Sequence, residues 1–225
     1  MFNDFKRISI ITGHYGSGKT NIAVNMAIDL KNQGKEVVLC DLDIVNPYFR
    51  SADFKELMDK EGIEIIAPMF ANSNLDIPAI TSEMYSVFGS CQKHIIIDVG
   101  GDDAGAFALG RFSKLIYDEN NFNVFYVINY YRMLIKEADD AAELMYEIEN
   151  AASLKAGYII NNSHLSNFTT DKTIIDSFEY ADEVSRKTGV PIAFHTVPAD
   201  IDKNKMPDTK NYYPVKIFVK SPWQE

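Results

Sequence analysis

Short apolar runs alternate along this chain with longer segments whose apolar residues recur every three or four positions. The runs at Val37–Leu39 and Ile95–Ile97 are continuous, which is typical of parallel strands covered on both faces. The longer segments have the spacing of amphipathic helices. Strands that alternate with helices predict an α/β fold, a doubly wound and mostly parallel sheet of about seven strands with helices on both faces.

The same pattern gives the expected bounds of each element. Strands are expected over residues 7–12, 36–41, 63–68, 94–99, 123–129, 156–161 and 191–197. Helices are expected near 18–33, 49–61, 78–89, 104–117, 136–153 and 172–188. The segment 212–220 alternates like a further short strand. Since the sequence shows no linker or repeat, one domain is expected over residues 1–225.

A glycine-rich loop follows the first expected strand and opens into the first expected helix. It fits the phosphate-binding pattern G-x-x-x-x-G-K-[ST] at every fixed position, with Gly13, His14, Tyr15, Gly16, Ser17, Gly18, Lys19 and Thr20. Glycines let backbone N–H groups approach phosphate oxygens, and the helix N-terminus adds a positive dipole end. We therefore expect Lys19 to reach the outer phosphates of a nucleotide and the Thr20 hydroxyl to bind Mg²⁺.

Acidic residues follow two of the expected strands. Asp41 and Asp43 end the second strand, and Asp98 ends the fourth. Ligands bind beyond the carboxyl ends of the strands in such sheets, so these carboxylates are candidates for holding Mg²⁺ or orienting an attacking water. Asp102 and Asp103 would repel a triphosphate unless a cation lies between them, and capping of the next helix is the alternative for them.

Polar residues at the ends of two later strands are candidates for binding a purine base. Asn161 and Asn162 follow the sixth strand, and Pro198 and Asp200 follow the seventh. An asparagine amide can pair with an adenine edge. The guanine-binding pattern Asn-Lys-x-Asp is missing, which favours adenine.

Composition narrows the partners and the compartment. The net charge is −10 and no basic stripe is present, which argues against nucleic acid as a partner. The acidic segment Glu137–Glu149 is expected to be the solvated face of a helix. No apolar run is long enough for a membrane span, and no signal peptide is evident. The chain has only two cysteines, without a C-x-x-C pair, and this suits a reducing cytoplasm.

Taken in order, these motifs resemble the MinD/ParA group of P-loop ATPases, which includes the nucleotide-binding domains of cobyrinic acid and dethiobiotin synthetases. The resemblance covers about residues 7–202. It implies ATP or ADP with Mg²⁺ at Lys19 and Thr20, Asp43 near the attacking water and Asp98 on the magnesium side. It also implies that Asn161 or Asn162 and the Pro198 segment flank adenine.

The chain departs from this group at one position. The group carries a lysine that crosses to the partner's nucleotide in a sandwich dimer, and His14 stands there in this chain. A mostly neutral histidine does not replace an ammonium, so a homodimer of that kind is in doubt. Replacement cations would be Arg50, Arg111 or Arg132, and the sequence does not choose among them.

Two functions remain open from the sequence. The first is a Mg²⁺-dependent, slow ATPase that acts as a nucleotide-dependent switch with an unknown protein or small-molecule partner. The alternative is an ATP-dependent carboxylate ligase that resembles dethiobiotin synthetase, with a substrate pocket formed by Asn46–Arg50 and the Asp102–Asp103 pair.

Overall fold

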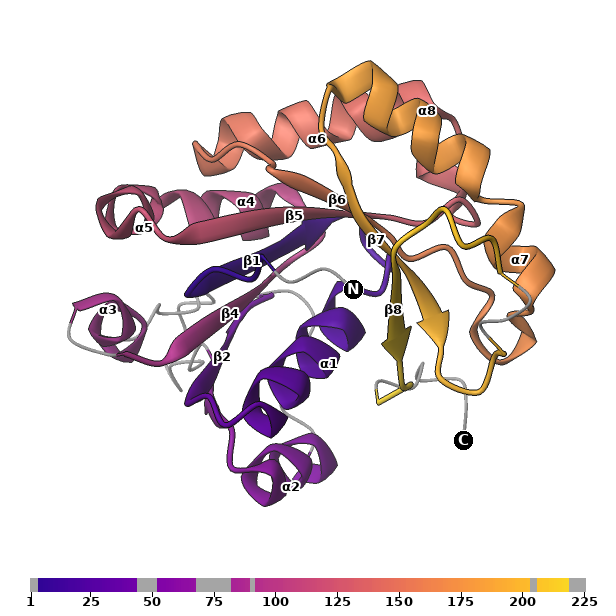
Figure 1. Ribbon diagram of the computed structural model, residues 1–225. Helices are drawn as coiled ribbons and strands as arrows, with labels where there is room; N and C mark the ends of the chain where they lie inside the picture. The colour runs from indigo at the N-terminus through magenta and orange to yellow at the C-terminus, as the bar shows by residue number, and fades with distance from the viewer. Residues whose placement is uncertain (1–3, 44–51, 68–81, 90–91, 203–205, 219–225) are drawn as a thin grey trace.

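Among the described residues, eight parallel strands form one sheet, with the first strand near its middle (Figure 1). The structure is a computed structural model that describes residues 4–43, 52–67, 82–89, 92–202 and 206–218. The strand order is β3-β2-β4-β1-β5-β6-β7-β8. The strands are β1 (Ile8–Gly13), β2 (Val37–Leu42), β3 (Glu64–Ile66), β4 (His94–Val99), β5 (Phe122–Ile128), β6 (Tyr158–Asn161), β7 (Ile192–Pro198) and β8 (Tyr212–Val215).

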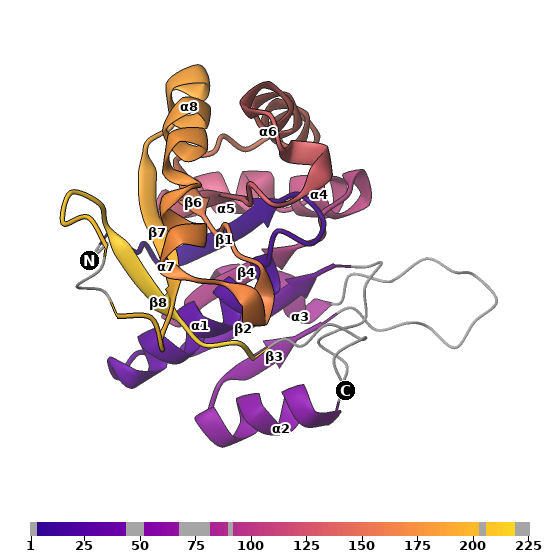
Figure 2. The same ribbon diagram turned by 90° about the vertical axis from the view of Figure 1, so that its right-hand side faces the viewer.

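Helices connect these strands and cover both faces of the sheet. They are α1 (Lys19–Asn32), α2 (Ala52–Glu61), α3 (Ser82–Gly89), α4 (Asp103–Gly110), α5 (Ser113–Glu119), α6 (Ala138–Ala152), α7 (Asp171–Ile175) and α8 (Phe178–Thr188), with short 3₁₀ turns η2 (Met133–Ile135) and η3 (Ser166–Phe168). Figure 2 shows α1 and α2 on one side of the sheet and α6 and α8 on the other. The doubly wound α/β fold predicted from the sequence is confirmed.

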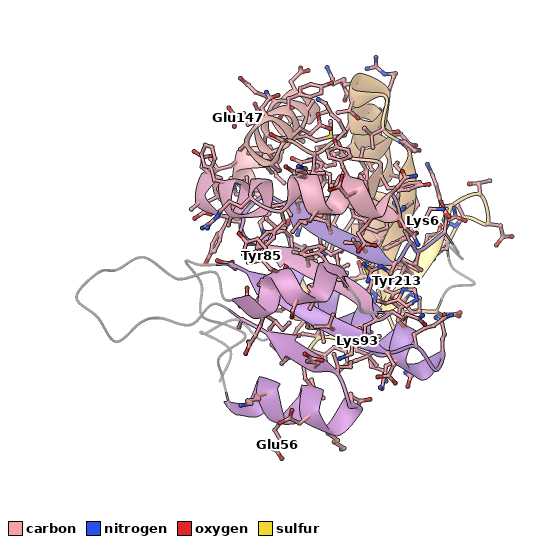
Figure 3. All side chains as sticks on the ribbon, turned by 90° about the vertical axis from the view of Figure 1, so that its left-hand side faces the viewer. Lys6, Glu56, Tyr85, Lys93, Glu147 and Tyr213 are labelled. Atoms are coloured by element: carbon pink, nitrogen blue, oxygen red, sulfur yellow. The ribbon has the colours of Figure 1, made fainter. Side chains whose placement is uncertain are left out.

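Continuous apolar runs supply the core on both faces. Alternate residues of β1 point to opposite sides, so Ile11 packs with α1 while Ile8 and Ile10 pack with α3, α4 and α5. A third cluster joins α6 and α8 to β5 and β6. The charged residues Glu56 and Glu147 lie on the outer surfaces of α2 and α6 (Figure 3).

Parallel pairing brings the carboxyl ends of the central strands to one edge. β1 is hydrogen-bonded between β4 and β5, with Ile11 opposite Asp98 and Gly13 opposite Val127. β2 lies beside β4, with Asp41 opposite Asp98. The residues that directly follow β1, β2 and β4 therefore lie at the edge where ligands bind in this class of fold.

The further short strand expected within 212–220 is confirmed, since Tyr212–Val215 pairs in parallel with β7. The structure corrects the bounds of two expected helices. The helix expected over 104–117 is two helices, because Phe112 turns into the core and packs against Phe88. The helix expected over 172–188 also divides, at the buried Ser177, whose hydroxyl donates to Ile174 O.

One acidic residue is not on the solvated face to which the sequence assigned it. Glu149 is buried near the end of α6, where its carboxylate accepts from the backbone N–H of Ala156 at 2.8 Å and from Lys155 Nζ at 2.6 Å. The segment that leads into β6 supplies both donors. The rest of the prediction for α6 is confirmed, because Ala141 and Met145 are buried and Glu147 is exposed.

Candidate functional site

The loop between β1 and α1 has the backbone shape that phosphate binding requires. Gly16 and Gly18 have φ values of +73° and +90°, which side chains other than glycine rarely adopt. The N–H of Ser17 donates to His14 O at 3.1 Å and closes the turn. α1 begins at Lys19, so its N-terminal N–H groups face the loop. Gly13 has no space for a side chain, because a Cβ there would lie 2.4 Å from Val127 O.

Lys19 is buried inside this loop. Its Nζ donates to His14 O at 3.1 Å, so the ammonium spans the turn. Burial lowers the pKa of Lys19, while the charges of Asp98, Asp43 and Asp102 act in the opposite direction. The lysine and the three acidic residues therefore form one electrostatic group at the carboxyl edge of the sheet.

Thr20 and Asp98 form the corner of the site at which the sequence predicts Mg²⁺. Thr20 Oγ1 donates to Asp98 Oδ2 at 2.7 Å, and Asp98 Oδ1, which is buried, has no hydrogen-bond partner among the described residues. Burial raises the pKa of Asp98 to about 7, against the opposing effect of Lys19. A buried carboxylate with a free oxygen is stabilised by a cation, so this corner fits Mg²⁺.

Asp41, within β2, and Asp43, directly after it, lie beside this corner. Asp41 is buried opposite Asp98, and its Oδ1 accepts from the backbone N–H of Asp43 at 2.7 Å. That hydrogen bond fixes where the chain leaves the strand. Within the part of the chain that the structure describes, no group of three or more His, Cys, Asp or Glu side chains is arranged to hold a metal ion.

The segment after β4 lies directly against the phosphate loop. A Cβ on Gly101 would lie 2.5 Å from Tyr15 N and 2.9 Å from Lys19 Nζ, so the loop leaves room only for glycine. A Cβ on Gly100 would lie 3.4 Å from Asp43 Oδ1. Asp102 is the N-cap of α4 and accepts from Gly105 N at 2.9 Å. Of the two roles considered for Asp102, the structure shows the cap.

Asn161, which ends β6, and Asn162, which follows it, have different environments. Asn162 Nδ2 donates to Ser17 O at 2.6 Å, and its Oδ1 accepts from Thr196 Oγ1 at 2.6 Å. Asn161 Nδ2 is instead 2.9 Å from both Ser177 Oγ and His195 Nδ1. Asn162 therefore connects β6 and β7 to the phosphate loop, whereas Asn161 fixes the packing of β6 against β7 and the start of α8. Contact of either amide with a base stays a prediction.

The seventh strand ends near the same edge. Pro198 is half-buried and its carbonyl accepts from Ile201 N at 3.0 Å, while Asp200 is exposed. The described residues show no hydrogen bond between this segment and the phosphate loop. Its role beside a base remains as the sequence predicted it.

Three residues near the loop lie outside the predicted set of nucleotide-binding residues, although the sequence named one of them, Arg132, as a candidate cation. His164 Nε2 would lie 3.3 Å from a Cβ on Gly18, and burial lowers the pKa of His164 to about 4. The Arg132 guanidinium carbon would lie 3.2 Å from a Cβ on Gly16. Asn129 directly follows β5, and its Nδ2 is buried without a partner among the described residues. All three follow a strand end, the signal that identified the other candidates.

Some predicted positions lie outside the described residues. These are Arg50 and the rest of the Asn46–Arg50 segment. Arg111 is described, as the C-cap of α4 at the end of that helix opposite Asp102. Its helix begins at the site and carries it away from the phosphate loop.

Comparison with known families identifies the chain. Residues 8–209 match the family described as the CobQ/CobB/MinD/ParA nucleotide-binding domain. The chain belongs to this family. The resemblance inferred from the motifs is confirmed, and the matched range includes the loop at 13–20, whose contact with phosphate stays a prediction. A search of curated proteins by sequence gives no match.

Solved structures share the fold of this nucleotide-binding domain at low sequence identity. The cell division protein FtsY from Thermotoga maritima has a TM-score of 0.57 and 17% identity, over 87% of this chain and 62% of that one. The signal recognition particle 54 kDa protein from Aeropyrum pernix K1, in complex with GDP, has a TM-score of 0.52 and 19% identity, over 84% and 40%. FtsY from Mycoplasma mycoides has a TM-score of 0.57 and 16% identity, over 87% and 61%. The chain thus spans about two fifths to three fifths of these proteins.

Proposed function

We propose that this nucleotide-binding domain binds ATP with Mg²⁺, hydrolyses it slowly and works as a nucleotide-dependent switch. The observation that carries the proposal is the corner formed by Lys19, Thr20 and Asp98. A buried lysine, a hydroxyl and a carboxylate with a free oxygen meet there at the N-terminus of α1. This combination of groups suits a phosphate chain with its magnesium ion.

Each group has a separate task in this proposal. The N–H groups of the loop and Lys19 would bind the phosphates, and Thr20 with Asp98 would hold Mg²⁺, directly or through water. When bound, Mg²⁺ neutralises charge that develops on the phosphate oxygens. Asp43 would orient the attacking water, since its backbone is fixed by Asp41 and its carboxylate lies beside Gly100.

A switch needs a segment that responds to the terminal phosphate. Gly101 is the candidate, because it lies against Tyr15 and Lys19 and is followed at once by the N-cap of α4. A contact between the terminal phosphate and the Gly101 N–H would pull on the start of α4. Loss of that phosphate would release the segment.

Adenine is proposed over guanine on the chemistry of the residues after β6. Guanine presents two kinds of N–H donor that a carboxylate accepts well, and residues 161–164, Asn-Asn-Ser-His, contain no carboxylate. Asn162 contacts the phosphate loop from that segment. The GDP in the complex of the signal recognition particle protein belongs to that protein. The affinities of this chain for ATP and GTP therefore have to be measured side by side.

The ligase alternative has lost part of its support. It needed the carboxylates of Asp102 and Asp103 for a substrate pocket, and Asp102 is committed to capping α4. The other part of that pocket, Asn46–Arg50, lies outside the described residues.

We also propose that the protein acts in the cytoplasm, which suits the free thiol of Cys40. No helix among the described residues is long and apolar enough to cross a membrane.

Calorimetry with ATP, ADP and GTP in the presence of Mg²⁺ tests the proposal. Lys19→Ala should weaken ATP binding by about 1.5–3 kcal/mol, or roughly 10- to 150-fold, because a charge-assisted hydrogen bond is lost. Lys114→Ala, on the exposed surface of α5, is the matched control and should bind as the wild type does. Equal ATP affinities in the two variants would contradict the site.

Hydrolysis is measured on the same preparations. Phosphate release should be slow, and Asp43→Asn should reduce it while ATP binding survives, because the amide keeps the shape and removes the charge of the acceptor. A panel of carboxylated metabolites is then added. Turnover that requires one metabolite would replace the switch with the ligase alternative.

A further inference from the structure

The phosphate loop of this chain carries less positive charge than its sequence motif suggests. Lys19 faces three acidic residues, Asp98, Asp43 and Asp102, all of which interact with its ammonium. His14 is mostly neutral at pH 7, because burial lowers its pKa from 6.5. A triphosphate brought to this loop needs a further cation to offset the repulsion among these negative groups.

Arg132 is the cation that the structure brings to the loop. If Gly16 carried a Cβ, that atom would be 3.2 Å from the guanidinium carbon of Arg132, 3.4 Å from Nε and 3.5 Å from Nη1. The guanidinium group therefore lies against the backbone of the loop. Gly16 belongs to the part of the motif whose N–H groups face the phosphates.

The segment that carries Arg132 is fixed at both ends. Tyr131 N–H donates to Asn129 Oδ1 at 3.0 Å, and Arg132 N–H donates to Asn129 O at 3.0 Å, which forms a tight turn after β5. Tyr131 Oη donates to Thr173 O at 2.7 Å, and Ile135, at the end of η2, is buried. The turn holds the backbone of Arg132 beside the loop before any ligand arrives.

The Arg132 guanidinium has no acidic partner among the residues that the structure describes. None of the ion pairs among the described residues includes Arg132. Burial is the main cause of the lowered pKa of both His14 and His164, and the nearby charge of Arg132 acts in the same direction. A guanidinium that is held at a phosphate loop without an anionic partner is suited to bidentate binding of phosphate oxygens.

We propose that Arg132 binds the terminal phosphate of the nucleotide and stabilises its transfer to water, from within the same chain. The proposal rests on the proposed function. Of the three arginines that the sequence left open, Arg111 lies at the far end of α4 and Arg50 lies outside the described residues. With this cation supplied in cis, hydrolysis does not require a second copy of the chain.

The test compares Arg132→Ala, Arg132→Lys and the control Arg111→Ala. Calorimetry uses ADP and a non-hydrolysable ATP analogue, each with Mg²⁺, and phosphate release is followed with ATP. Arg132→Ala should weaken binding of the analogue about 10-fold or more and leave ADP nearly unchanged. Turnover should fall on the order of 100-fold or more. Arg132→Lys should recover part of the binding and little of the turnover, since it lacks the planar fork.

Two further measurements separate this role from a structural one. Guanidinium ion at a concentration below denaturation should restore part of the turnover of Arg132→Ala and none of that of Lys19→Ala. A mixture of Arg132→Ala with Lys19→Ala should show no more turnover than the two proteins apart, because each chain needs both cations. Recovery in the mixture would overturn action in cis.

The inference and the proposed function fail in different ways. If the wild-type protein does not bind ATP, the proposed function is wrong. If it binds and hydrolyses ATP, and Arg132→Ala matches Arg111→Ala to within about twofold in both assays, only the role of Arg132 is wrong. Thermal unfolding of each variant confirms that it is folded, and Arg132→Lys remains informative if Arg132→Ala is not.

Discussion

Replacing Gly101 by alanine tests the contact between the segment after β4 and the phosphate loop. The added Cβ would lie 2.5 Å from Tyr15 N, 2.6 Å from Tyr15 Cα and 2.9 Å from Lys19 Nζ. The first two are backbone atoms of a loop that is closed by its own hydrogen bond, so they cannot rotate away as a side chain would. Gly101 does not have a left-handed φ, and the cost therefore comes from the contact and not from the backbone conformation.

The size of the effect follows from these distances. Ordinary contact begins at 3.4 Å, so Tyr15 N and the new methyl group must separate by about 0.9 Å beyond the 2.5 Å of the present structure. Overpacking of this kind costs about 1–3 kcal/mol. For a chain of this size, each kcal/mol lowers the melting temperature by about 2–4 °C. A displacement of about 1 Å at a reacting group can also reduce turnover on the order of 100-fold.

Thermal unfolding and phosphate release on Gly101→Ala measure both effects. Gly157→Ala is the matched control, because a Cβ there meets only Val124 O, at 3.9 Å. The control should keep the wild-type melting temperature and turnover. The reasoning is refuted if Gly101→Ala melts and hydrolyses ATP as Gly157→Ala does, since the loop would then accept a methyl group that the structure leaves no room for.

Two further predictions concern single titratable groups. Burial raises the pKa of Asp98 to about 7 from 3.8, so the protonated form stabilises the free protein at low pH, and this stability is lost as pH rises from about 4 through 7. Asp98→Asn cannot titrate at this position and therefore does not lose this stability. Without nucleotide, the difference in melting temperature between Asp98→Asn and the wild type should increase in favour of the variant from pH 4 to pH 7. Melting temperatures that change in parallel with pH in the two proteins would contradict the raised pKa. Since the pKa of His14 is lowered from 6.5, His14 is neutral at pH 7.5. We therefore expect no ATP-dependent dimer that requires His14. Light scattering with ATP measures this in the Asp43→Asn variant, which prevents turnover. A dimer that His14→Ala abolishes at pH 7.5 would show that this histidine can replace the lysine of the family.

Much of the site could be predicted from local sequence because its parts are local. The loop from Gly13 to Thr20 is continuous in the chain, and its spacing alone specifies glycines at the left-handed positions and a helix that begins at Lys19. Asp98 is predictable for a similar reason, since it directly follows a continuous apolar run, and such a run indicates a buried strand. Alternating strands and helices then determined the parallel sheet and the edge at which these parts meet.

The tertiary structure decided the contacts between segments that are distant in the chain. The pattern after β6 is two asparagines in a row, and only the packing of β6 against β7 shows that Asn162 contacts the phosphate loop while Asn161 faces His195. The sequence does not distinguish among the three arginines that could replace the lysine of the family. Only the turn after β5 brings Arg132 to Gly16.

The physical reason is the range over which each property acts. Periodicity and motif spacing report which residues are buried and how the backbone turns, and both depend on neighbours within a few positions. Which charge offsets which other charge depends on distances of a few ångströms between separate elements, and those distances are set by the order of the strands. The sequence by itself therefore determined a nucleotide-binding loop on a parallel sheet, and the fold decided which side chains surround it.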